Sequence, residues 1–199
     1  MSKLISYLLH PIFVPLIGLF FILNSGAYIS VIDIRIVRML YLIVATFTLL
    51  LPLVLISLFL FSGFVRSVNL EDRRQRIIPY FMTFILFYIA YFLVKKLPVS
   101  SFIASFLFAS AISLLIIIII TYFWKISSHM AGMGGLAGLM LCLSYVFNTD
   151  TMYFLVIILL VSGLLASARI SLKEHTPKEV YTGFILGFVM VFSICLFYS

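Results

Sequence analysis

Charge is scarce in this sequence, and most of it is basic. Only 10% of the 199 residues are charged, 13 Lys or Arg against 6 Asp or Glu, whereas 65% are apolar. A soluble domain is about 45–50% apolar and about 25% charged. The chain therefore lacks the polar surface that a water-facing protein needs. This composition excludes a soluble enzyme, a DNA-binding domain and a disordered tail.

Cysteine is almost absent as well. The chain has two, Cys142 and Cys195. Both lie inside apolar runs, and their spacing fits neither a metal site nor a disulfide framework. A secreted disulfide scaffold is therefore excluded, and we interpret both residues as small core side chains.

Long apolar runs are what the sequence has in place of charge. Seven of them, bounded by charged residues, have lengths that suit membrane-spanning helices. They cover roughly 5–23, 39–65, 77–94, 102–124, 130–147, 152–168 and 180–198. The sequence thus predicts an all-α, polytopic transmembrane bundle of six or seven spans, forming one integral membrane domain over residues 1–199.

The first run leaves the number of spans open. It shows no small-residue cleavage site, so we interpret it as a retained span rather than a signal peptide. Its prolines and His10 also fit a segment that lies at the membrane interface, which would reduce the count to six. We interpret His10, which stands alone beside Pro11, as a structural residue.

The charges gather in three short segments. If all seven runs cross the membrane, segments 66–76, 125–129 and 169–179 emerge on the same side. Together they hold 12 of the 19 charged residues, and also His129 and His175. Solubility alone does not require such clusters, so we interpret the three segments as parts of one site.

The first two segments carry groups that suit a phosphate. Arg73 and Arg76 present planar, permanently charged donors to phosphate oxygens, although a solvated loop obeying the positive-inside rule is the alternative. Ser127 or Ser128 is expected to cap the next helix, whose free N–H groups form an anion site. His129 would lie in its first turn and could transfer a proton near neutral pH. Plain capping and an interfacial histidine are the alternatives here.

The third segment carries a candidate nucleophile. Thr176, Pro177 and Glu179 fit the start of a helix with a capping box. The same turn can place Glu179 beside His175, where a carboxylate that accepts an imidazole N–H makes the other nitrogen a better nucleophile. Arg169 would be a further phosphate ligand.

These residues resemble the motifs of the type 2 phosphatidic acid phosphatase superfamily, membrane lipid phosphatases related to vanadium haloperoxidases. The third motif of the family is Ser-Arg, five residues, His, three residues, Asp. Here Arg169, His175 and Glu179 follow the same spacing, with Ala168 before the arginine. The second motif, Pro-Ser-Gly-His, is matched by Ile-Ser-Ser-His at 126–129.

The first motif of the family is matched loosely. It reads Lys, six residues, Arg-Pro, and Arg73, Arg76 and Pro79 are the nearest equivalents. Lys125 or an arginine could replace the absent lysine. The resemblance implies a phosphatase-like core over about residues 66–187.

The resemblance implies roles for the individual residues. His175 would attack phosphorus and form a phosphohistidine, Glu179 would orient His175, and His129 would protonate the leaving oxygen. The phosphate would be bound by Arg73, Arg76, Lys125, Ser127, Ser128 and Arg169. It implies no cofactor and no metal, and the sequence lacks the carboxylate cluster of a magnesium site.

The function that we predict is hydrolysis of a phosphomonoester or pyrophosphate on a lipid, with the lipid and the membrane as partners and no nucleic acid. The alternatives are an anionic-lipid transporter or flippase without chemistry, and a lipid phosphotransferase. We expect the bacterial inner membrane. The positive-inside rule would place the site in the cytoplasm, but the family works more often on the outer side, so we expect a periplasmic site.

Overall fold

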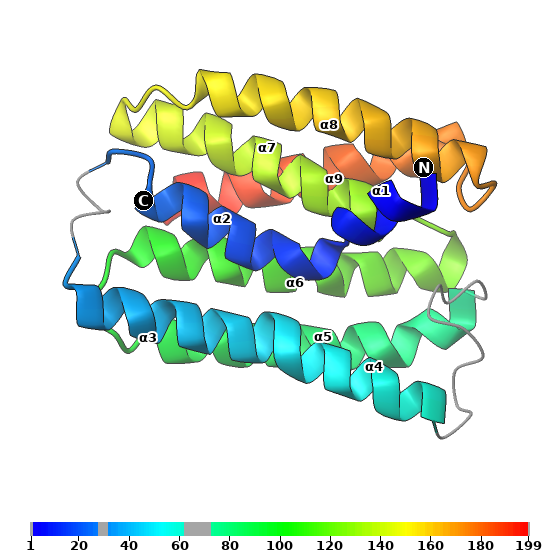
Figure 1. The fold of residues 1–199 in the computed structure, drawn as a ribbon, viewed down its shortest axis with the longest axis horizontal. Helices are drawn as coiled ribbons and strands as arrows, with labels where there is room; N and C mark the ends of the chain where they lie inside the picture. Colours follow the sequence, from blue (N-terminus) through cyan, green and yellow to red (C-terminus); the bar gives the residue numbers. More distant parts are fainter. Residues whose placement is uncertain (1, 28–31, 62–72, 199) are drawn as a thin grey trace.

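The protein is a bundle of helices (Figure 1). The computed structural model describes residues 2–27, 32–61 and 73–198, apart from the side chains of 73–75, and this part contains no strand. Its elements are α1 (Ser2–Leu8), η1 (Pro11–Phe13), α2 (Val14–Leu23), α3 (Ile34–Val44), η3 (Ala45–Leu50), α4 (Leu51–Phe61), α5 (Arg73–Val94), α6 (Ser101–Phe123), α7 (Ser128–Phe147), α8 (Met152–Ser171) and α9 (Pro177–Phe197).

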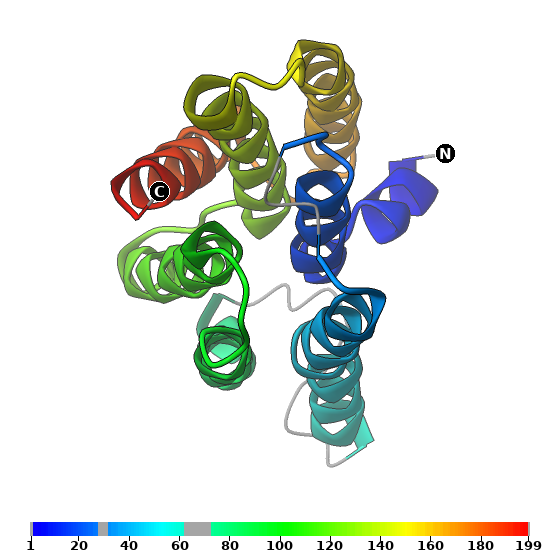
Figure 2. The same ribbon diagram turned by 90° about the vertical axis from the view of Figure 1, so that its left-hand side faces the viewer.

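The predicted all-α membrane class is confirmed. Seven helical segments of the described chain are long and apolar enough to cross a membrane. One of them is Ser2–Leu23, so the first apolar run counts among the seven candidate spans. Figures 1 and 2 show the segments packed side by side, with α2 in the middle of the end-on view.

Two of the spans are interrupted. The first breaks after α1, where the His10 side chain caps the 3-10 turn η1 and Pro11 occupies its first position. The second span passes through the π-helical segment η3 just before Pro52. Proline has no N–H to donate to the preceding turn, which favours such a local change of helix type.

The helices begin earlier than the apolar runs predicted. The second span starts at Ile34 rather than near residue 39, because Asp33 caps α3 through the Arg35 N–H and two arginines lie in the first turns. Charged residues in the first turns of a helix also have helical backbone. The charged residues that bound an apolar run therefore mark the ends of the apolar part of a helix, and not the ends of the helix itself.

Glycines allow α7 and α9 to approach closely. A Cβ on Gly134 would overlap the carbonyl oxygen of Phe184, and one on Gly187 would overlap that of Ala131. This agrees with the close packing expected for small residues in membrane helices. It also brings the start of α7 against the start of α9, where the predicted site lies.

Candidate active site

The described residues of the three predicted segments lie at one end of the bundle, the right-hand end of Figure 1, together with α1. The Ser127 N–H donates to the Glu179 carbonyl oxygen across 3.3 Å, which joins the start of α7 to the start of α9. The Tyr80 hydroxyl on α5 is hydrogen-bonded to the Ser128 hydroxyl at 3.0 Å. The starts of α5, α7 and α9 therefore lie at the same end of the bundle, as the parity argument from the sequence requires.

The start of α7 has the predicted cap. Ser127 is the N-cap residue, and its hydroxyl oxygen accepts the Met130 N–H at 3.5 Å. Ser127 and Ser128 are both buried. The first turn of α7 therefore carries the partial positive charge of a helix N-terminus inside the protein, where an anion is favoured.

The start of α9 orients His175. The predicted capping box is present, with the Thr176 hydroxyl accepting the Glu179 N–H and Glu179 Oε2 accepting the Thr176 N–H. The same Oε2 lies 2.8 Å from His175 Nδ1. A carboxylate oxygen accepts, so Nδ1 carries the proton and the lone pair of the neutral ring lies on Nε2. This arrangement leaves Nε2 as the nucleophilic nitrogen.

Basic side chains surround His175. Burial, followed by the positive charges of Arg169, Arg76 and Lys125, lowers the pKa of His175 to about 3. The imidazole is therefore neutral at physiological pH, the form that a nucleophile needs. Three cations around one neutral imidazole also make this end of the bundle attractive to an anion.

Arg169 is buried with an unused donor. It is 5% exposed, and it forms an ion pair with Glu174. Its Nε has no hydrogen-bond partner among the described residues. A buried donor without a partner costs free energy, about 1–3 kcal/mol and more when charged. Such a donor indicates a ligand that supplies the missing acceptor.

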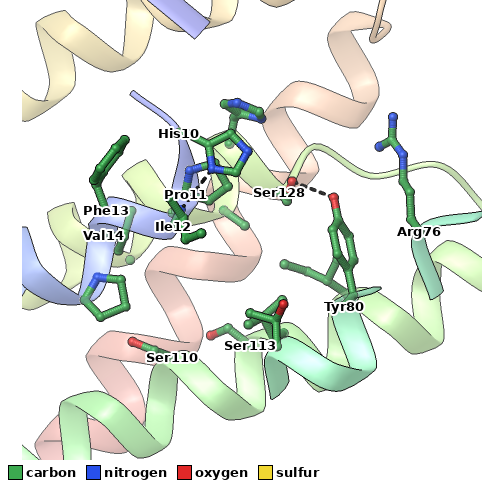
Figure 3. A pocket seen from close by; sticks show the side chains of 18 of the residues that line it. His10, Pro11, Ile12, Phe13, Val14, Arg76, Tyr80, Ser110, Ser113 and Ser128 are labelled. Carbon is green, nitrogen blue, oxygen red and sulfur yellow. Dashed lines mark hydrogen bonds between the residues drawn. The ribbon is translucent and has the colours of Figure 1, made fainter. Parts of the chain in front are cut away.

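A cavity of about 350 Å³ opens beside these groups (Figure 3). Small-molecule sites commonly have about 300–1,000 Å³. Its polar wall comes from several helices and includes Lys3, Ser6, His10, Arg76, Tyr80, Ser128, His129, Arg169 and Glu174. The remaining wall is mostly apolar and includes Phe13, Val14, Leu53, Ile56, Phe87, Leu114, Ile117 and Val191.

The hydroxyl groups on the apolar wall add little polarity. Thr83, Ser110 and Ser113 donate to carbonyl oxygens of their own helices, at 2.8, 2.9 and 2.7 Å. Their donors are thus already used inside α5 and α6. The cavity therefore combines one cationic end with a long apolar remainder.

The cavity includes some predicted residues and not others. Arg76, Ser128, His129 and Arg169 line it, whereas Lys125, Ser127, His175 and Glu179 do not. The side chain of His175 is 1% exposed. The predicted nucleophile thus lies behind the cationic wall rather than on the cavity surface.

Lys125 lies near the same cations. Burial lowers the pKa of Lys125, and Arg76 lowers it further, while Glu179 and Glu174 act in the opposite direction. The predicted ligand Arg73 is in the first turn of α5, but its side chain is outside the described part of the chain. The acidic residues of segment 66–76 also lie outside it.

Five residues of the polar cavity wall, Lys3 among them, were not predicted as site residues from the sequence. Glu174 precedes His175 directly, and its position within the third motif was the only sequence feature that pointed to a place in the site. Tyr80 follows Pro79 in an apolar helix and gave no signal. Ser6 and His10 come from the first span, and His10 both caps η1, as a structural residue does, and faces the cavity.

Comparisons with known proteins find no match to this chain among family models, curated proteins or solved structures. The phosphatase resemblance therefore rests on the residues described above.

Proposed function

We propose that this protein hydrolyses the phosphate group of a membrane lipid, through a phosphohistidine on His175. The observation that carries the proposal is the buried Arg169, whose Nε lacks a partner among the described residues at the cationic end of an apolar cavity. A lipid phosphate has the matching chemistry, because its anionic head fits the arginines and its hydrocarbon fits the apolar wall. Such a substrate can be a phosphomonoester or a pyrophosphate.

The reaction uses the observed tautomer of His175. Its Nε2 lone pair attacks phosphorus, the bond from phosphorus to the leaving oxygen breaks, and His129 in its protonated form gives that oxygen a proton. Water then attacks the phosphorus of the phosphohistidine, the bond from phosphorus to Nε2 breaks, His129 takes one proton from the water, and inorganic phosphate leaves. Glu179 holds the Nδ1 proton and stabilises positive charge on the ring in both steps.

Glu174 competes with the substrate in this scheme. Its carboxylate forms the ion pair with Arg169, so a phosphate that binds Arg169 must displace it. Because Glu174 precedes His175 in the same turn, this displacement also offers a route by which the buried imidazole reaches the phosphate. The stabilisation of the incoming charge comes from the arginines and the start of α7.

A different function is favoured by one observation. His175 does not line the cavity, and its side chain is almost fully buried, which suits an anionic-lipid transporter or flippase that performs no chemistry. A lipid phosphotransferase would share the first step of the proposed reaction and differ in passing the phosphoryl group to another acceptor.

Phosphate release from purified protein tests the proposal. We expect wild-type protein in detergent to release phosphate from phosphatidic acid or a polyprenyl pyrophosphate, and His175→Asn to release none. Lys178→Ala is the matched control, because Lys178 is exposed in the first turn of α9. A transporter would show no release in any variant, and a transferase would need an added acceptor.

The location is part of the same proposal. We place the protein in the bacterial inner membrane with the site on the periplasmic side. Lys173 is exposed in the loop between α8 and α9, so a cysteine introduced there reports the side of the site. Labelling of Lys173→Cys in intact cells by a membrane-impermeant reagent supports a periplasmic site, and labelling only after lysis contradicts it.

A further inference from the structure

A third histidine reaches the cavity from the first span. His10 lies between α1 and η1 and lines the cavity, with Ser128 and Tyr80 to its right in Figure 3. Its ring meets that of His129 edge to face, with centroids 5.1 Å apart and an interplanar angle of 82°. An edge-to-face contact of this kind fixes the relative orientation of the two rings.

Backbone contacts assign the protons of both rings. The Ile12 N–H donates to His10 Nδ1 at 3.3 Å, so the neutral His10 ring carries its proton on Nε2. His129 Nε2 lies 3.2 Å from the Ser6 carbonyl oxygen, which can only accept, so His129 donates from Nε2 and the lone pair of the neutral ring lies on Nδ1. The pair therefore offers one donor, His10 Nε2–H, and one proton-accepting nitrogen, His129 Nδ1.

The hydrogen bond found for His10 in the described part of the chain is at Nδ1, so its Nε2–H is available to a ligand in the cavity that the residue lines. Ser6, from the same span, has a buried hydroxyl without a partner in that part of the chain, and both residues line the cavity. Arg169 Nε is a further buried donor without an acceptor on the wall of this cavity, and such donors indicate a ligand rich in oxygen atoms.

We propose that His10 is a ligand-binding residue of this site, donating its Nε2–H to a non-bridging oxygen of the lipid phosphate, beside His129. The proposal rests on the proposed function for the identity of the ligand. A neutral donor suits the position, since Arg76 and Arg169 already supply two buried positive charges.

Two substitutions separate this role from capping. In His10→Asn the side-chain oxygen can replace Nδ1 as the cap of η1, because Asn is a preferred N-cap, but the distal donor is lost. In His10→Gln the amide nitrogen reaches the position of Nε2, but the capping acceptor is lost. His10→Asn therefore loses the donor and keeps the capping acceptor, whereas His10→Gln keeps the donor and loses the capping acceptor.

The test combines turnover with binding of hexadecylphosphonate, a lipid phosphate analogue that cannot be hydrolysed. Binding is followed by the fluorescence of the single tryptophan, Trp124, which precedes Lys125. The loss of a hydrogen bond to a charged group lowers a rate or an affinity by about tenfold or more. We expect His10→Asn to lose about that factor in kcat/KM and in affinity, while its melting temperature stays near that of wild type. We expect His10→Gln to melt at a lower temperature and to keep most of its rate and affinity.

The other outcomes overturn one proposal or both. If His10→Asn matches wild type, or if both variants lose rate and affinity equally, His10 has only a structural role. Wild type could release no phosphate and still bind the phosphonate, with a lower affinity in His10→Asn than in His10→Gln. In that case the hydrolysis proposal is wrong, and the role of His10 in binding stands. If wild type does not bind the phosphonate, both proposals are wrong.

Discussion

Replacing Glu179 with glutamine separates the two functions that its carboxylate combines. Glu179 Oε2 accepts both the His175 Nδ1–H, at 2.8 Å, and the Thr176 N–H, at 3.2 Å. Both partners donate, so the amide oxygen of a glutamine can take the place of Oε2. Glutamine is also tolerated at this position of a capping box. The substitution therefore keeps the helix cap and the tautomer of His175, and it removes the negative charge.

The size of the effect follows from that geometry. A hydrogen bond to a charged group contributes about 1.5–3 kcal/mol, and each 1.36 kcal/mol changes a rate by about tenfold. We therefore expect Glu179→Gln to lower kcat by about 10- to 150-fold. The loss would reach about 10⁴-fold if the imidazole adopted the wrong tautomer. Because the cap is retained, the melting temperature should change little.

Phosphate release from a lipid phosphate in detergent measures kcat, and a thermal melt measures stability. Glu179→Ala is the comparison, because it also removes the acceptor of the Thr176 N–H, the Glu179 half of the capping box, which costs about 0.5–1.5 kcal/mol, and should lower both quantities. Equal rates for Glu179→Gln and wild type would show that the carboxylate is only a helix cap. A large fall in melting temperature for Glu179→Gln would show that its charge stabilises the fold.

Three further predictions concern pH, competition and packing. The pKa of His175 is lowered to about 3 in the folded protein, against about 6.5 when unfolded, so its contribution to stability is complete above pH 6.5 and is lost as pH falls toward 3. We expect the melting temperature to fall between pH 6.5 and 4, and less steeply in His175→Asn; equal slopes would contradict this pKa. Glu174→Gln removes the carboxylate that pairs with Arg169 and should strengthen inhibition by inorganic phosphate, whereas weaker inhibition would mean that Glu174 orients Arg169 for the ligand. Gly187→Ala forces α9 away from the Ala131 carbonyl and should destabilise the protein by about 1–3 kcal/mol or more; an unchanged thermal melt would show that the α7–α9 contact is looser than described.

The helical class and the meeting of the three polar segments follow from the sequence, and the reason is physical. Runs of about 20 apolar residues can satisfy their backbone groups in a bilayer only as helices. The number of crossings then decides which segments share a face. The contact of His175 with Glu179 was also predictable, since the capping box turns the Glu179 side chain back to the Thr176 N–H, next to His175.

The cavity itself was not predictable in the same way. His10 stands in an apolar run, and its position against His129 depends on how α1 and η1 pack on α7. The ion pair between Arg169 and Glu174 and the burial of His175 likewise depend on packing between helices. Spacing along the chain predicted which residues meet, but not which of them face the cavity.

Trapping of the covalent intermediate tests the central claim most directly. Protein mixed with a lipid carrying a labelled phosphate is quenched within the first turnover, kept at neutral to alkaline pH and digested, and the labelled peptide is identified by mass spectrometry. We predict that the label is on His175, that it is lost in acid as a phosphohistidine is, and that His175→Asn carries none. Phosphate release without label on His175, or label that persists in His175→Asn, would contradict the proposed reaction.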